Sequence, residues 1–209
     1  VWWVFKQIYD KELVYRGFKI MPYSTSCTTP LSNFEAKSNY KDVTDESIIV
    51  GFEVLLMDDT YLLAWTTTPW TLPSNLALCV NPNITYVKVL DIKSNKYYIL
   101  AKSRLNEIYK KKDLYKSIEE NQGTYYAGLR YKPLFDYFED KFKNGAFKVL
   151  IDNYVTEDSG TGIVHCAPAF GEDDFRVCVN NNIISKDGTN MVCPIDENGN
   201  YTEEVGIYS

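Results

Sequence analysis

Apolar and β-branched residues form short blocks separated by turn residues along most of this chain, a pattern typical of β-rich folds. Apolar residues near helical spacing predict a helix at residues 1–16, and further helices are predicted at residues 103–109 and 173–180. Because short turns join most strands and few helices intervene, we predict an α+β fold with a mixed β-barrel-like core decorated by helices. The predicted strands cover residues 18–21, 47–57, 61–65, 77–80, 86–90, 97–100, 147–151 and 162–165.

The composition is ordinary for a soluble globular protein, with 45% hydrophobic and 24% charged residues. The 209 residues suit one sizeable domain with a full core. No apolar run is long enough to span a bilayer, and no signal-peptide pattern opens the chain. The five cysteines lack C-x-x-C spacing, and their odd number favours reduced, intracellular thiols over a zinc site or a disulfide framework.

The charge balance argues against a dedicated nucleic-acid binder. The net charge is −6, whereas affinity for nucleic acid normally grows from basic residues that neutralise phosphates. Lysines do occur at 110–112 and at Lys141, Lys143 and Lys148, but they are patchy. A solvated face explains these lysines adequately, although any of them could also contact a phosphate.

The most informative polar segment covers residues 65–75 and reads Trp-Thr-Thr-Thr-Pro-Trp-Thr-Leu-Pro-Ser-Asn. It follows directly on a predicted strand. Pro69 and Pro73 prevent regular pairing or a regular helix through it and stiffen the backbone. Hydroxyl groups held on such a rigid loop can position water and bind polar atoms of a substrate. The alternative is an ordinary threonine-rich strand edge and turn.

A second polar segment covers residues 160–175 and reads Gly-Thr-Gly-Ile-Val-His-Cys-Ala-Pro-Ala-Phe-Gly-Glu-Asp-Asp-Phe. Its glycines permit positive φ or close backbone approach. His165, the only histidine, ends the short strand, and a lone histidine is more often a packed residue than a catalyst. Asp173 and Asp174 fall in the first turn of a helix, where free N–H groups stabilise carboxylates. Only one of them can be the cap, and a second carboxylate there suits an ammonium group.

Together, the two segments resemble the editing domain of class I aminoacyl-tRNA synthetases of the isoleucyl, valyl and leucyl group. In that family a threonine-rich peptide and a Gly-Thr-Gly-x-Val-His segment with a later Asp-Asp pair face each other across the deacylation site. Flanking segments at 23–43, 131–138 and 192–196 are similar to the eukaryotic-type, cytoplasmic isoleucyl branch. The resemblance implies a single editing domain over residues 1–209, with connections to a missing catalytic core at about 1–20 and 200–209.

The implied activity is hydrolytic proofreading, in which water attacks the ester of valyl-tRNA(Ile) while isoleucine is rejected. Valine and isoleucine differ by one methylene, which contributes only about 1–3 kcal/mol of binding free energy in a synthetic pocket. The isoleucyl enzyme is itself the standard example of this limited discrimination. The implied partners are the 3′-terminal adenosine of aminoacylated tRNA(Ile) and the rest of the synthetase. We expect this acidic chain to bind the tRNA end only weakly by itself, and we expect no binding to a membrane. No His-x-x-His or Lys-Met-Ser-Lys-Ser-like motif is present, so we expect no cofactor here, because ATP and magnesium belong to the synthetic domain.

The resemblance also implies roles for individual residues. Asp174 would anchor the α-ammonium through charge-assisted hydrogen bonds, which leaves Asp173 as the helix cap. Thr68 and Asn75 take roles in hydrolysis, and no metal ligand is expected. A neutral His165 would limit side-chain volume or hold the water, without being an obligatory base. The residues expected to bind the amino acid are Trp65, Thr66, Thr67, Thr71, His165 and Phe170, with burial in the core as the alternative for Trp65, Thr71 and Phe170.

Other readings remain open at this level. A covalent role for Cys166 is disfavoured, because adjacent residues of a strand point to opposite faces, away from His165. The same domain in a valyl or leucyl enzyme would clear threonine or a leucine-like amino acid instead. The chain could also be a module that docks the acceptor end of tRNA without catalysis, or a free-standing editing protein.

Overall fold

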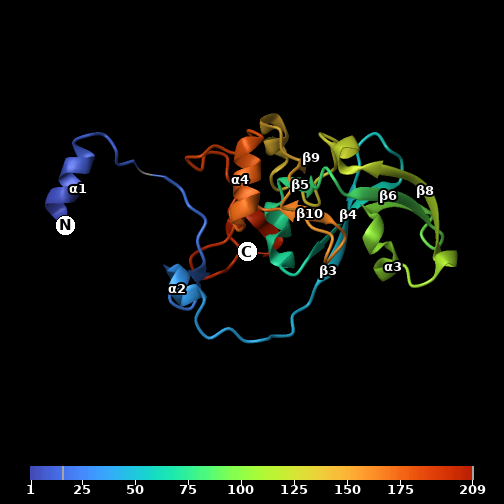
Figure 1. Cartoon of the computed structure of the whole chain (residues 1–209), viewed down its shortest axis with the longest axis horizontal. Helices are drawn as coiled ribbons and strands as arrows, with labels where there is room; N and C mark the ends of the chain where they lie inside the picture. The colour runs from blue at the N-terminus through green and yellow to red at the C-terminus, as the bar shows by residue number, and fades with distance from the viewer. Residues whose placement is uncertain (16, 209) are drawn as a thin grey trace.

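The computed structural model describes residues 1–15 and 17–208 and is drawn in Figure 1. Its α-helices are α1 (Trp2–Tyr9), α2 (Asn33–Ala36), α3 (Leu105–Ile108) and α4 (Glu172–Asn180). The 3₁₀ helices are η1 (Pro69–Ser74), η2 (Lys102–Arg104), η3 (Lys112–Leu114), η4 (Gly123–Tyr126), η5 (Glu139–Asn144) and η6 (Glu203–Tyr208). The strands are β1 (Tyr23–Ser24), β2 (Thr29–Pro30), β3 (Ile48–Glu53), β4 (Thr60–Thr66), β5 (Ala77–Val80), β6 (Thr85–Asp91), β7 (Lys96–Ala101), β8 (Tyr115–Gln122), β9 (Lys148–Ile151) and β10 (Ile163–Cys166).

The strands form three sheets among the described residues. The largest has the order β3-β4-β7-β6-β8, with β4 and β7 parallel and the other pairs antiparallel. The second has the order β10-β5-β9, with β5 antiparallel to β10 and parallel to β9. β1 and β2 form a separate ribbon. Because β10 also packs against β4, the two larger sheets are in direct contact.

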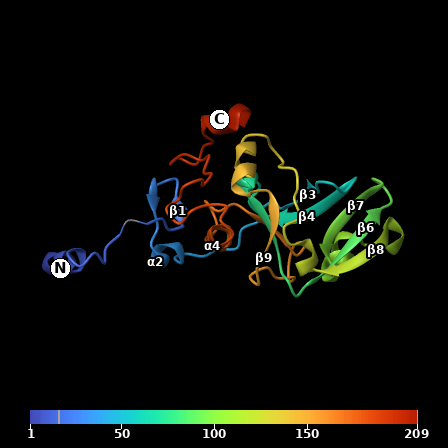
Figure 2. The same cartoon turned by 90° about the horizontal axis from the view of Figure 1, so that it is seen from above.

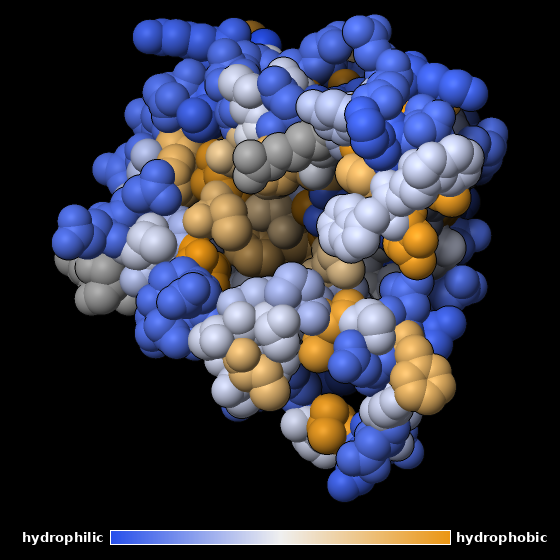
Figure 3. All heavy atoms as spheres, turned by 90° about the vertical axis from the view of Figure 1, so that its left-hand side faces the viewer, coloured by the Kyte–Doolittle hydropathy of each residue, from blue (hydrophilic) through white to orange (hydrophobic). Residues whose placement is uncertain are grey.

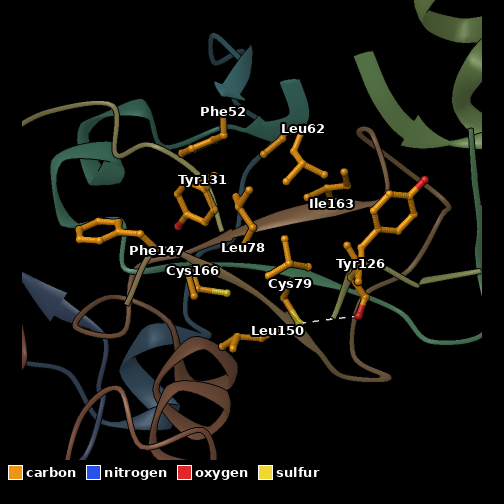
Figure 4. Close-up of a cluster of buried hydrophobic side chains, with 14 of the residues drawn as sticks. Phe52, Leu62, Leu78, Cys79, Tyr126, Tyr131, Phe147, Leu150, Ile163 and Cys166 are labelled. Atoms are coloured by element: carbon orange, nitrogen blue, oxygen red, sulfur yellow. Dashed lines mark hydrogen bonds between the residues drawn. The ribbon is translucent and has the colours of Figure 1, made fainter. Parts of the chain in front are cut away.

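The main hydrophobic core is built from residues of both larger sheets, and Figure 4 shows a close-up of its buried side chains. All four residues of β5 are buried, as are most of β4, which explains why these strands read as apolar blocks. Phe52, Leu62, Leu78, Tyr131 and Phe147 pack together there. A smaller cluster lies between the large sheet and α3 and contains Val87, Val89, Leu100, Leu105 and Tyr109.

The loop before β10 is held against the large sheet. The Ala101 N–H donates to the Thr161 carbonyl at 2.8 Å, and the Tyr86 hydroxyl donates to the Gly162 carbonyl at 2.7 Å. Gly162 has φ +74°, and a Cβ at this position would lie 2.4 Å from the Ala101 Cβ. Glycine is therefore required, both for the left-handed backbone and for the close approach of β10 to β7.

The predicted α+β class is confirmed, although the sheets of the described residues stay open and do not close into a barrel. The strands predicted at 77–80, 86–90, 97–100 and 162–165 are present with small shifts at their ends. The helix predicted at 103–109 is shorter and divided between η2 and α3. β8 was missed, because its alternating polar residues lie at the sheet edge and carry little apolar signal.

Two predictions for the start of the chain were wrong. The helix predicted at 1–16 ends at Tyr9, and Glu12 has φ +56°, which a continuing helix does not allow; residue 16 lies outside the described residues. Residues 18–21 form no strand, because they have no neighbouring strand to pair with. Instead, Phe18 and Ile20 line a hollow beside α4 together with Phe175.

Helix α1 lies apart from the rest of the chain in both Figure 1 and Figure 2. None of its residues is buried, and Trp2 and Trp3 are 82% and 74% exposed. The face of the molecule seen from this side has a central hollow where apolar residues gather among hydrophilic ones (Figure 3). Among the described residues, no helix combines the length and the apolar character needed to cross a bilayer.

Candidate functional site

A cavity of about 310 Å³ opens where the end of β4, η1, the end of β10 and the start of α4 come together. The two polar segments singled out in the sequence therefore face each other across one space. The first segment contributes Trp65, Thr66, Thr67, Thr68 and Thr71 to its wall. The second contributes His165, Phe170 and Asp174.

The threonine hydroxyls form a connected cluster. The Thr66 Oγ1 accepts from the Thr68 N–H at 3.0 Å and lies 3.3 Å from the Thr68 Oγ1, which in turn lies 3.5 Å from the Thr71 Oγ1. Pro69 begins η1 and Pro73 lies within it, so the backbone that carries the hydroxyls is stiff. The hydroxyls are thus held in fixed positions before any substrate binds.

His165 is held by hydrogen bonds on both ring nitrogens. Its Nδ1 lies 3.0 Å from the Asn75 Nδ2, and its Nε2 lies 2.8 Å from the Thr71 Oγ1. An amide nitrogen only donates, so Nδ1 accepts and the ring proton is on Nε2. The Thr71 Oγ1 donates its own proton to the Thr68 carbonyl at 2.8 Å and is free to accept from Nε2. The ring is therefore fixed in one neutral tautomer.

Burial supports the same protonation state, because it lowers the pKa of His165 to about 4. His165 is only 7% exposed, and it is one of the residues that line the cavity. The ring has no free lone pair in this arrangement, so it is poorly placed to accept a proton from water. A neutral, immobile imidazole of this kind is suited to act as a wall of the cavity.

Asn75 lies behind His165 and is not among the residues that line the cavity. Its Nδ2 donates to the Ala77 carbonyl at 2.9 Å, and its Oδ1 accepts from the Tyr131 hydroxyl at 2.6 Å. These contacts fix the orientation of the amide with its nitrogen toward His165. The structure gives Asn75 a place in orienting the histidine, whereas a direct role in hydrolysis stays a prediction.

Asp174 is the carboxylate of the cavity. It is the third residue of α4, and its Oδ2 accepts from the Ala167 N–H at 3.0 Å while its Oδ1 accepts from the Tyr154 hydroxyl at 3.3 Å. Burial raises the pKa of Asp174 to about 6, against the lowering effect of these two hydrogen bonds. The carboxyl is consequently charged at neutral pH, at an energetic cost that a bound cation would reduce.

The prediction that Asp173 caps α4 was wrong. The N-cap is Gly171, which makes no side-chain cap, and Asp173 points instead to Arg176, with 2.9 Å between its Oδ1 and the Nη2. The carboxyl of Asp173 is therefore occupied on the outer surface of the helix. A Cβ on Gly171 would lie 2.6 Å from the Asp174 Oδ2, so the glycine leaves room for the carboxylate.

The two aromatic residues proposed to shape the site, Trp65 and Phe170, both lie at the cavity. Trp65 and Phe170 are partly exposed and line the cavity, so neither is simply a core residue. Phe170 packs edge-to-face on Trp70, with 5.0 Å between the ring centroids. Trp65 contacts the opposite loop, since a Cβ on Gly160 (φ +67°) would lie 2.9 Å from the Trp65 ring.

Cys166 follows His165 but has a different environment. It is fully buried, does not line the cavity, and has its Sγ 3.5 Å from the Tyr154 hydroxyl. The neighbouring Cys79 thiol and burial raise the pKa of Cys166, so the thiol stays protonated. Within the part of the chain that is described, no three His, Cys, Asp or Glu side chains gather in a way that could hold a metal ion.

Sequence reasoning missed two tyrosines at this site. Tyr154 lines the cavity and donates to Asp174, and Tyr131 orients Asn75 from the core. Neither position stands out in the sequence, because the chain contains 17 tyrosines and nothing local marks these two. A residue distant in sequence, Arg104, also stabilises the cavity wall at Gly160, because its Nε donates a hydrogen bond to the Gly160 carbonyl at 3.1 Å.

Comparison with known proteins gives consistent results. The family described as tRNA synthetases class I (I, L, M and V) matches residues 1–187. The chain is 58% identical to the cytoplasmic isoleucine–tRNA ligase of Mus musculus over 98% of its length, which is 16% of that protein. It is 53% identical to the cytoplasmic enzyme of Saccharomyces cerevisiae over 99% of its length, which is 20% of that protein. The chain thus spans at most a fifth of the length of these relatives.

Solved structures share the fold. The structure of GlLeuRS-CP1 matches with a TM-score of 0.56 and 19% identity, over 72% of this chain and 70% of that one. The editing domain of the P. knowlesi cytosolic leucyl-tRNA synthetase matches with a TM-score of 0.51 and 15% identity, over 63% of this chain and 59% of that one. At this level of identity the likeness establishes the architecture, and the chemistry has to be argued from the cavity.

Proposed function

Because the chain belongs to the class I tRNA synthetases of the isoleucyl, leucyl, methionyl and valyl group, we propose that it is the editing domain of a cytoplasmic isoleucine–tRNA ligase. Its task is to remove valine from tRNA(Ile) by hydrolysis. The observation that supports this function is the pairing, in one small cavity, of the Asp174 carboxylate with the threonine hydroxyls. A carboxylate and fixed hydroxyls suit an aminoacyl ester, which carries an ammonium group beside a carbonyl.

The ammonium of the amino acid binds the Asp174 carboxylate through charge-assisted hydrogen bonds. This contact places the neighbouring carbonyl beside the hydroxyls of Thr66, Thr67 and Thr68, which stabilise the negative charge that develops on its oxygen. Water adds to the carbonyl carbon, the bond to the ribose oxygen breaks, and that oxygen takes up a proton. Free valine and uncharged tRNA leave. Thr68, at the centre of the hydroxyl cluster, is the best placed to orient the water.

His165 supplies the steric test in this scheme. Its neutral ring forms a rigid wall, held by Asn75 and Thr71 on its two nitrogens. Valine fits against the wall, whereas the additional methylene of isoleucine collides with it. Asn75 accordingly acts on hydrolysis through the position of the histidine, and Trp65 and Phe170 complete the rim around the ester.

The partners follow from the same assignment. The 3′-terminal adenosine of aminoacylated tRNA(Ile) enters the cavity, and the exposed apolar face of α1 packs against the remainder of the synthetase. ATP and magnesium serve the synthetic reaction in that remainder. The location is the cytoplasm, as for the relatives whose names state it.

The test is deacylation of valyl-tRNA(Ile) and isoleucyl-tRNA(Ile) by this chain at micromolar concentration. Hydrolysis of the valyl ester, with the isoleucyl ester spared, is expected. Asp174→Ala should abolish it while circular dichroism stays unchanged, and Asp113→Ala, a surface carboxylate of η3 outside the cavity, is the control. Binding without turnover would favour a docking module, which the net charge of −6 makes a weak one. Faster hydrolysis of threonyl-tRNA(Val) or of mischarged tRNA(Leu) would assign the chain to a sister enzyme.

A further inference from the structure

Asp174 receives one hydrogen bond on each carboxylate oxygen, and the two donors differ in kind. The Ala167 N–H belongs to the backbone of the loop after β10, only seven residues away along the chain. The Tyr154 hydroxyl comes from the segment after β9, on another wall of the cavity. Replacing a side chain can remove only the second donor, so only Tyr154 can be tested as a separate contributor.

Tyr154 is itself fixed by a cluster of charges on the outer side of α4. The guanidinium of Arg176 lies 5.8 Å from the centre of the Tyr154 ring, a cation–π distance. The same guanidinium forms two hydrogen bonds with the Asp152 carboxylate, at 2.8 and 3.0 Å, and contacts Asp173. The Asp152 Oδ1 also accepts from the Tyr154 N–H at 3.0 Å, which ties the backbone of this segment to the same cluster.

Resting on the editing function proposed above, we propose that Tyr154 is the positioning residue that aims the Asp174 carboxylate into the cavity, and that Arg176 and Asp152 hold Tyr154 in place. The tyrosine contacts the carboxylate and not the reacting ester. Its hydroxyl keeps one oxygen of Asp174 in a fixed direction, and it stabilises the charged form of a group that burial disfavours.

The other ionisable groups around Asp174 do not replace this donor. Asp173 on the same helix is a like charge, and the thiols of Cys166 on β10 and Cys178 on α4 are both protonated because their pKa values are raised. His165 across the cavity is neutral and engaged on both nitrogens. The Tyr154 hydroxyl has a raised pKa as well, chiefly through burial, so it remains a donor over the working pH range.

The decisive variant is Tyr154→Phe, which keeps the ring under Arg176 and removes only the hydroxyl. Loss of a hydrogen bond to a charged acceptor should raise the pKa of Asp174 by about one unit. The acid limb of the deacylation profile then moves up by about one pH unit, so that activity falls about threefold at pH 6.5 and is retained at pH 8.5. A merely structural role would lower activity equally at every pH.

The chain offers a matched control in Tyr109→Phe. Tyr109 is likewise a buried tyrosine that interacts with a carboxylate, that of Asp91, but it lies in the cluster beneath α3. This variant makes the same atomic change away from the cavity, and it should leave the pH profile of deacylation where it is. A shift as large as that of Tyr154→Phe would show a general effect of losing a buried hydroxyl and would overturn the inference.

A titration of the full chain labelled with ¹³C-aspartate separates this inference from the editing function. The Asp174 signal, identified by its absence in Asp174→Asn, reports its pKa without any substrate. A pKa that is the same in wild type and Tyr154→Phe overturns the inference even if deacylation is found. A raised pKa supports it even if the substrate proves to be different. Arg176→Gln, which leaves the hydroxyl in place, should shift the pKa in the same direction by less, and it replaces Tyr154→Phe if that variant does not fold.

Discussion

Asp174→Asn should make this protein more stable while removing its activity. The substitution replaces a partly buried carboxylate by a neutral amide of nearly the same shape. The amide can keep both contacts, with its oxygen accepting from the Ala167 N–H and its nitrogen donating to the Tyr154 oxygen. What it removes is the charge, and with it the anchor for an ammonium group.

The magnitude follows from the pKa. Burial raises the pKa of Asp174 from the ordinary 3.8 to about 6 in the folded protein. Two pKa units correspond to about 3 kcal/mol of stability that is lost when the group ionises in the folded state. The folded state binds the proton more tightly than the unfolded state, so between pH 4 and pH 6 the free energy of unfolding decreases as the pH rises. The asparagine variant does not lose stability in this way, because its side chain does not ionise.

The assay is urea unfolding of wild type and variant at pH 4 and pH 7. We expect near-equal stability at pH 4 and a gain of about 1–3 kcal/mol for the variant at pH 7, since partial exposure reduces the full effect. In thermal unfolding, each kcal/mol raises the Tm of a domain of this size by about 2–4 °C. A variant that is less stable than wild type at pH 7, or a difference that does not depend on pH, would refute the reasoning.

Three further predictions concern the site and the loop that holds it. The rate of deacylation should fall as the pH drops through about 6, where Asp174 becomes protonated. It should show no change between pH 6.5 and 8 that titration of His165 would cause, because the pKa of His165 is lowered to about 4. A rate that stays constant from pH 7.5 to 5 would exclude Asp174 as the anchor. His165→Ala should allow isoleucyl-tRNA to be hydrolysed, and continued sparing of that ester would mean that another wall rejects it. Gly162→Ala should destabilise the fold by more than about 3 kcal/mol in urea unfolding, because the new Cβ meets the Ala101 Cβ at 2.4 Å. Gly128→Ala, with the same φ of +74° but no atom within 4 Å, is the control and should lose only about 1–2 kcal/mol; equal losses would contradict the clash.

The sequence by itself determined the local structure of the site and much of the fold. All-apolar stretches such as residues 77–80 can be satisfied only by burial on both faces, so their strands were predictable. The prolines of residues 65–75 dictate a stiff loop after a strand, whatever packs around it. Acidic residues after Gly171 likewise begin a helix for local electrostatic reasons. The family resemblance was visible in the sequence because the residues of each polar segment are contiguous along the chain.

Only the tertiary structure decided which of these groups meet and what each one does. His165 reaches Asn75 and Thr71 because β10 pairs with β5 in a register that places His165 opposite Leu78, next to η1. That register depends on side-chain packing across some 90 residues of chain, and no local pattern encodes it. The same packing buries Asn75 behind the histidine, brings Asp152 to Arg176 and brings Tyr154 to Asp174. Local propensities act over a few residues, whereas the shape and charge of a cavity come from the sum of distant contacts.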